Sequence, residues 1–143
     1  MSEQENTKLA KSFFDNLNAH DLDKNDPLTA ENSKTDATGA TGLTTREQGR
    51  AYTQGFFTAF PDLHFDVTQI VAQGDYVVLN WSGSGTHTGP LTTPSGGTIA
   101  PTGKKSSVPG STTLEIKGGK ITHTWIYFDM ASLLGQLGLL PPM

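Results

Sequence analysis

The sequence contains no cysteine among its 143 residues. Disulfide bonds, thiolate metal ligands and a cysteine nucleophile are therefore excluded as a basis for its function. Long apolar segments are missing too, because no run approaches the roughly 20 residues that a membrane-spanning helix needs. The acidic, polar residues 1–6 also lack the apolar core of a signal peptide. We therefore expect a cytoplasmic protein that does not bind a membrane.

Clusters of basic residues are absent as well. Ten Lys and Arg residues stand against 14 Asp and Glu residues, which gives a formal net charge of −4. We expect no nucleic-acid partner, because surfaces that bind nucleic acids are rich in Lys and Arg. No glycine-rich phosphate loop joins a strand pattern to a helix pattern. None of the four histidines has a metal-ligand spacing with a carboxylate, so we expect neither a metal nor another cofactor.

The chain contains a helical pattern followed by a β pattern. Its length suits a single domain over residues 1–143. Apolar residues at helical spacing predict a helix over 6–19, with Asn6 or Thr7 as its N-cap. A short helix is expected over 21–28. The stretch 29–43 shows no periodicity, so we predict a loop that acts as a flap.

A further helix is predicted from Thr44 to Phe60. Its start has capping-box spacing, and Pro61 ends it because the residue before a proline avoids helical backbone angles. Tyr52 and Phe56 form an aromatic stripe on this helix. Such a stripe either packs in the core or lines a cavity, where the Tyr52 hydroxyl would reach a ligand.

After Pro61 the apolar period changes to two, which is typical of strands. We predict strands over 63–68 and 76–81, bends in the Gly-rich stretch 82–89, a loop over 90–103, and strands over 105–117 and 121–129. Gly118-Gly119 predicts a two-residue hairpin between the last two strands. Helices followed by a long, bent antiparallel sheet indicate the α+β class, with the sheet wrapped around the helices and a cavity between them.

The hairpin allows the faces of the last strands to be predicted. If Gly118 and Gly119 are its two loop residues, Val108 lies opposite Asp129, and opposite residues point to the same side. Asp129 then points inward with Trp125 and Tyr127. The other face carries apolar residues that suggest a subunit interface: Ile126, Phe128 and Met130. A register change of one residue would reverse this assignment.

Asp129 is the main candidate for chemistry. A carboxylate at the end of an aromatic strand is unusual, since Asp is depleted in strands and costly to bury. It either caps the helix that follows or acts as an acid/base group. His123 cannot be its direct partner, because six residues of strand separate the two by about 20 Å.

Other candidates surround the predicted cavity. His87 lies in the Gly-rich stretch and either donates a hydrogen bond to an oxyanion or fixes the bend in the strand. Asn80 and Trp81, on the strand before it, are candidates for ligand contacts. Trp125 and Tyr127 are expected to form pocket walls.

Several motifs occur in one order along the chain: Phe57-Thr58-Ala59-Phe60-Pro61-Asp62-Leu63, Gly85-Thr86-His87-Thr88-Gly89, Pro101-Thr102-Gly103, Gly119-Lys120-Ile121, Trp125 with Asp129, and Leu133-Leu134-Gly135-Gln136-Leu137-Gly138. Together they resemble the SnoaL-like polyketide cyclase family, from about Phe13 to Leu140. The resemblance implies the nuclear transport factor 2-like fold, a cone-shaped roll like that of cystatin. It also implies an apolar pocket and assembly as a homodimer or homotetramer.

Characterised cyclases of this family close a ring in a polyketide methyl ester by intramolecular aldol condensation, without metal or cofactor. The resemblance places their acid/base Asp at Asp129. It therefore implies a cofactor-independent cyclase or isomerase of an apolar carbonyl compound. Relatives that act as hydroxylases, epoxide hydrolases or non-catalytic binding proteins give the alternatives, since one fold hosts many functions.

Overall fold

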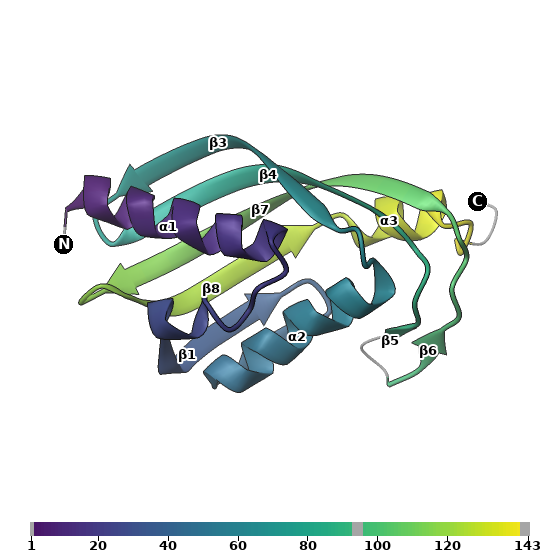
Figure 1. The fold of residues 1–143 in the computed structure, drawn as a ribbon, viewed down its shortest axis with the longest axis horizontal. Helices are drawn as coiled ribbons and strands as arrows, with labels where there is room; N and C mark the ends of the chain where they lie inside the picture. The colour runs from purple at the N-terminus through teal and green to yellow at the C-terminus, as the bar shows by residue number, and fades with distance from the viewer. Residues whose placement is uncertain (1, 93–95, 141–143) are drawn as a thin grey trace.

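The computed structural model describes residues 2–92 and 96–140. Within them, helices lie against one face of a curved sheet (Figure 1). The helices are α1 (Glu3–Asn18), η1 (Asp26–Leu28, a 3₁₀ helix), α2 (Arg46–Ala59) and α3 (Met130–Gln136). The strands are β1 (Thr29–Ala37), β2 (Ala40–Leu43), β3 (His64–Gln73), β4 (Tyr76–Thr86), β5 (Leu91–Thr92), β6 (Thr98–Ile99), β7 (Lys105–Lys117) and β8 (Lys120–Phe128).

The main sheet has the strand order β2-β1-β8-β7-β4-β3. All of its pairs are antiparallel except β1 and β8, which run parallel, so the sheet is mixed rather than purely antiparallel. The predicted α+β class with a bent sheet around N-terminal helices is confirmed. None of the described helices is long and apolar enough to cross a membrane.

Both long helices begin with capping boxes. In α1 the cap is Ser2, whose hydroxyl accepts the N–H of Glu5, so the helix starts before the predicted Asn6 or Thr7. In α2 the cap is Thr45 with Gln48 as its partner, one residue beyond the predicted Thr44. The short helix expected over 21–28 is reduced to η1.

The prediction of a loop over residues 29–43 is wrong. These residues form β1 and β2, and β1 joins the sheet beside β8. Its inward side chains are Ser33, Thr35 and Ala37, which are buried but small or polar. The alternation that normally identifies a strand is one of apolar and polar residues, and β1 does not have it.

The two-residue hairpin at Gly118-Gly119 is confirmed, and both glycines have the positive φ that this turn requires. The predicted register holds only for the first two pairs, because a β-bulge then leaves Thr122 without an opposite residue. The Thr122 hydroxyl donates to the backbone carbonyl of Glu115 or to its carboxylate, which holds the bulge in place.

The bulge reverses the faces that were predicted for the rest of β8. Glu115 now pairs with His123 and Thr113 with Trp125, so Trp125 and Tyr127 point outward. Ile126 and Phe128 point inward and pack against the core. The prediction of a subunit interface at these two residues is therefore wrong.

The core lies between the helices and the inner face of the sheet. Side chains from α1, β4, β7 and β8 meet there, and most are completely buried: Ala10, Phe14, Leu17, Val77, Leu79, Leu114, Ile116 and Ile121. These residues fill the end of the fold near the β7–β8 turn. A second group around Phe60, Val108 and Leu133 packs α2 and α3 together at the other end.

Candidate functional site

A cavity of about 110 Å³ lies between α1, α2 and the inner face of the sheet. Aromatic and aliphatic side chains provide most of its wall: Phe13, Phe14, Leu17, Tyr52, Phe56, Phe60, Leu63, Phe65, Trp81, Val108, Ile126, Phe128 and Leu133. The volume is several times the roughly 10–15 Å³ that one water molecule needs. A concave site with apolar walls suits a small apolar ligand.

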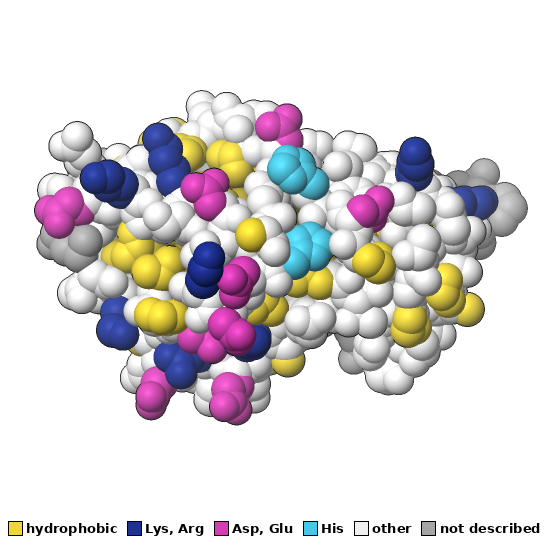
Figure 2. All heavy atoms as spheres, viewed as in Figure 1, with side chains coloured by type: hydrophobic (Ala, Val, Ile, Leu, Met, Phe, Trp, Pro, Cys, Tyr) yellow, Lys and Arg dark blue, Asp and Glu magenta, His cyan; other side chains and the backbone are white. Residues whose placement is uncertain are grey.

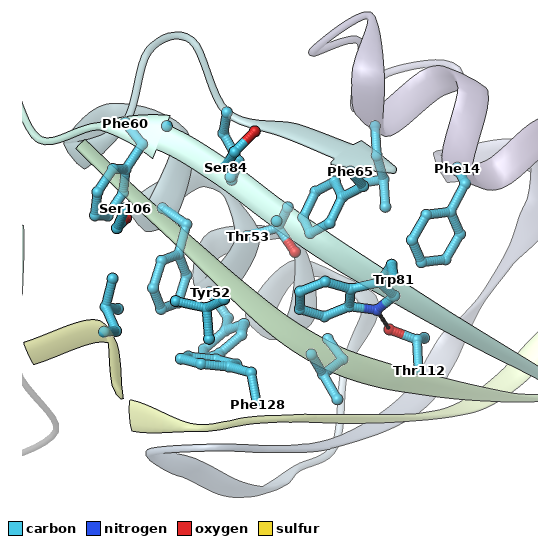
Figure 3. Close-up of a pocket in the computed structure, with 18 of the residues that line it drawn as sticks. Phe14, Tyr52, Thr53, Phe60, Phe65, Trp81, Ser84, Ser106, Thr112 and Phe128 are labelled. Atoms are coloured by element: carbon cyan, nitrogen blue, oxygen red, sulfur yellow. Dashed lines mark hydrogen bonds between the residues drawn. The ribbon is translucent and has the colours of Figure 1, made fainter. Parts of the chain in front are cut away.

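The aromatic rings of the wall support one another. Phe65 meets Trp81 edge to face at 4.9 Å between ring centres, and Phe56 meets Phe128 in the same way at 5.6 Å. Figure 3 shows Phe65, Trp81 and Phe128, with Phe14 and Tyr52, around one space. Edge-to-face contacts are favourable arrangements of aromatic rings. The wall is therefore fixed by packing between α1, α2, β3, β4 and β8.

Trp81 occupies its place because of a glycine on the neighbouring strand. A Cβ atom at Gly110 would lie 2.3–2.7 Å from the Trp81 ring, so only glycine leaves room for it. The indole N–H donates to the Thr112 hydroxyl at 3.0 Å, a bond visible in Figure 3. The ring is thereby held flat against β7.

Polar groups are few in this wall. The Tyr52 hydroxyl donates to the carbonyl of Thr38 at 2.8 Å, and burial raises the pKa of Tyr52. Thr53, Ser84, Ser106, Thr112 and Thr124 supply hydroxyls. Among the described residues, no Asp, Glu, His, Lys or Arg lines this cavity. The cavity thus offers neutral hydrogen-bonding groups and no strong acid or base.

Three of the predicted ligand-contacting residues line the cavity, namely Tyr52, Phe56 and Trp81. The prediction is wrong for Asn80, whose amide donates to Gln69 on the outer face. It is also wrong for Trp125 and Tyr127, because the bulge turns both of them outward. Ile126 and Phe128 line the wall but were not predicted to do so. Their spacing of two residues along β8 was visible in the sequence, but the predicted register placed them on the outer face.

Trp125 belongs instead to a polar cluster on the outer face of the sheet. It stacks on His123 at 3.7 Å between ring centres. The His123 ring is 2.8 Å from the carboxylate of Asp36. The N–H of Gly42, and after it His123, lowers the pKa of Asp36 by hydrogen bonding to its carboxylate. His123 therefore interacts with β1.

Asp129 caps α3 and is exposed. Its carboxylate accepts the backbone N–H of Ser132 at 3.0 Å. The predicted inward orientation is wrong, since it relied on a register that the bulge breaks. Even so, Asp129 directly follows Phe128 and precedes Leu133 by one helical turn, and both of these residues line the cavity.

The cap predicts a measurable effect on stability. We expect Asp129→Ala to lower the free energy of unfolding by about 1 kcal/mol, because α3 loses the acceptor for its first turn. Asp129→Ser should change the free energy of unfolding by only about a few tenths of 1 kcal/mol, since serine is an equally good N-cap. Urea unfolding of both variants would check this. Equal loss in both variants would contradict the capping role.

His87 is completely buried and lies behind the cavity wall. Its ring stacks on Phe60 at 5.3 Å, and its Nδ1 accepts the backbone N–H of Thr102 at 3.2 Å. Nδ1 also lies 3.0 Å from the Thr102 hydroxyl, and Nε2 makes no hydrogen bond among the described residues. The backbone of His87 also bonds Gly103 and Lys104. These contacts favour the predicted role of fixing the bend after β4.

The burial of His87 predicts a pH dependence. Burial lowers the pKa of His87, so the unfolded chain takes up a proton there that the folded chain does not. Stability should fall as the pH drops below about 6.5, the value for an unfolded histidine. His87→Gln should flatten the curve between pH 7 and 5. Urea unfolding across this range would check it, and an unchanged curve in the variant would contradict the assignment.

Solved structures that are similar to this chain share its fold. AclR from Streptomyces galilaeus, a candidate hydroxylase, is 25% identical with a TM-score of 0.84, and the match covers 99% of this chain and 86% of that one. A candidate SnoaL-like polyketide cyclase from Jannaschia sp. CCS1 is 20% identical with a TM-score of 0.85, covering 97% and 94%. IdmH from Streptomyces antibioticus, a candidate polyketide cyclase, is 23% identical with a TM-score of 0.77, covering 93% and 98%.

No curated protein sequence gave a significant match. The sequence model of the SnoaL-like polyketide cyclase matches residues 8–137, which is nearly the whole chain. This range includes most of α1, all of α2, the entire main sheet and the wall of the cavity. The chain therefore belongs to the SnoaL-like polyketide cyclase family.

Proposed function

We propose that this protein binds an apolar, carbonyl-bearing small molecule of the polyketide type in the aromatic cavity and closes a ring in it. The observation that carries the proposal is the cavity itself, a space with an almost wholly apolar wall inside a member of a cyclase family. Such a wall favours a ligand by burying its apolar surface, which contributes roughly 25 cal/mol per Å². Neutral groups such as Thr124 and Ser84 would orient the carbonyl oxygens.

The chemical step of the proposal is an intramolecular aldol reaction. A base removes a proton beside one carbonyl, the resulting carbon attacks a second carbonyl of the same molecule, and an acid protonates the new alkoxide. We assign both proton transfers to Asp129, because it lies between the wall residues Phe128 and Leu133 and matches the acid/base position that the family resemblance indicates. To do this, the Asp129 carboxylate would give up the hydrogen bond that it accepts from the N–H of Ser132 and would contact the substrate instead.

A second candidate function is non-catalytic binding of the same class of ligand. It is favoured by the cap at Asp129, and by the lack of a charged acid/base group in the described wall of the cavity. The two candidates differ in one observable. Both predict binding in the cavity, and only the first predicts conversion of the ligand.

The two tryptophans provide the test of binding. Trp81 lines the cavity and Trp125 lies on the outer face, so Trp125→Phe leaves a single reporter in the wall. We expect titration with aromatic polyketide esters to change the emission of this variant. The matched variant Trp81→Phe, which retains only the outer tryptophan, should show little change. Equal responses in both variants, or none in Trp125→Phe, would contradict binding in the cavity.

A further inference from the structure

A second, smaller cavity of about 60 Å³ lies beside the aromatic one. It is enclosed by η1, the beginning of β1, the N-terminal half of α2 and β8, which lie close together in Figure 1. The two cavities share part of their walls: Phe13, Leu17, Thr53, Thr124 and Ile126. A ligand that reaches from one space into the other would lie against these shared side chains.

Polar side chains make up more of the wall of this polar cavity than of the aromatic one. Ser33, Thr35 and Thr124 are 2%, 6% and 8% exposed, and all three line it. Within the described part of the chain, none of these hydroxyls makes a hydrogen bond. None of their oxygens is among the buried polar atoms that lack a partner in the described residues, so the three hydroxyls are open to this space and can bond a polar atom that enters it.

Among the described charges around the polar cavity, Arg46 is left without a carboxylate partner. Arg46, Arg50 and Asp26 line it, and Asp23 binds Arg50 from outside the wall, so two positive charges stand against two negative ones. Figure 2 shows acidic and basic side chains gathered over this part of the molecule. Arg50 is already bound to Asp26 at 2.8 Å and to Asp23 at 2.7 Å.

Arg46 is the cation that remains available. Its guanidinium donates to the backbone carbonyls of Asp26 and Thr29, both at 3.2 Å. It makes no ion pair with a carboxylate among the described residues. These two bonds occupy one nitrogen of a group with five N–H donors, so the fork that binds a carboxylate is left free.

We propose that the polar cavity binds the carboxylate of an amphipathic ligand whose apolar body occupies the aromatic cavity. Arg46 supplies the charge, and the hydroxyls of Ser33, Thr35 and Thr124 complete the hydrogen bonds. The proposal rests on the proposed binding function of the aromatic cavity and narrows its ligand class to apolar carboxylic acids. Water would satisfy the hydroxyls, but it would leave Arg46 without a negatively charged partner.

Two probes of nearly equal shape test this proposal: 4-(2-naphthyl)butanoate and its primary amide. Titration calorimetry at pH 7 should show the carboxylate binding the unmodified protein about tenfold more tightly than the amide, as expected for hydrogen bonds to a charged group. Arg46→Met should remove this preference and leave binding of the amide nearly unchanged. Lys24→Met is the matched control, because it removes an exposed positive charge nearby and should keep the preference.

The outcomes separate this proposal from the proposed function. If the unmodified protein binds neither probe, both fail together. If it binds the two probes equally, or if Arg46→Met keeps the preference, the carboxylate site is refuted and the apolar binding function stands. Should Arg46→Met fail to fold by circular dichroism, Ser33→Ala replaces it. This variant should weaken carboxylate binding about threefold and leave the amide unaffected, and equal affinities for the unmodified protein and Ser33→Ala would also refute the site.

Discussion

Asp129→Asn is expected to lower ring closure by at least about 100-fold, the lower end of what a positioned acid/base group contributes. Asparagine has nearly the shape of aspartate but cannot accept a proton from the carbon beside a carbonyl. It also remains a good N-cap, so α3 should keep its start at Met130. The loss would therefore report on chemistry rather than on folding.

The experiment follows conversion of a panel of polyketide esters by the unmodified protein and by Asp129→Asn. Binding is measured in parallel through Trp81 emission, in the Trp125→Phe background. Asp129→Ser is the control, since it also keeps the cap and removes the carboxylate. We expect both variants to bind the ester and neither to convert it. Equal conversion by Asp129→Asn and the unmodified protein would rule out Asp129 as the acid/base group, and binding without conversion by any of the proteins would favour the binding-only function.

Gly110→Ala is expected to have the largest effect on the cavity. The added Cβ would lie 2.3–2.7 Å from the Trp81 ring, far inside van der Waals contact, so the ring must leave its place on β7. Its bond to Thr112 would then break. We expect the free energy of unfolding to fall by about 1–3 kcal/mol, the usual cost of overpacking a core. The displaced ring would enter the cavity and weaken ligand binding.

Gly55→Ala is the matched control for this substitution. Gly55 lies within α2, and a Cβ there would meet no atom within 4 Å. Alanine should stabilise the helix by about 0.5–1 kcal/mol and leave ligand binding unchanged. Urea unfolding and titration of both variants would check this. Unchanged stability and binding in Gly110→Ala would show that the Trp81 ring does not depend on this glycine.

Local patterns in the sequence determined much of the fold. The helical spacing and Pro61 located α2, and the bounds of β7 were predicted without error. Gly118-Gly119 identified the hairpin correctly. These features depend on a few neighbouring residues, through backbone conformation and side-chain periodicity, so a single sequence contains the necessary information.

The candidate site was predicted less completely because it is assembled by contacts between distant segments. Tyr52, Phe56 and Trp81 do line the cavity, whereas Trp125 and Tyr127 were placed on the wrong face. One extra residue in a strand reverses all the side chains that follow it. Nothing in the local sequence marks Thr122 as that residue, since the bulge is held by its contact with Glu115 on the neighbouring strand.

By itself, the sequence determined that this protein has N-terminal helices, a curved sheet and the features of its family. The tertiary structure alone decided that β1 completes the sheet, that Asp129 caps α3, and that an aromatic cavity adjoins a polar one near Arg46. The physical reason is the range of the interactions. Helices and turns follow from residues a few positions apart, whereas strand register and cavities depend on packing between segments that the sequence separates.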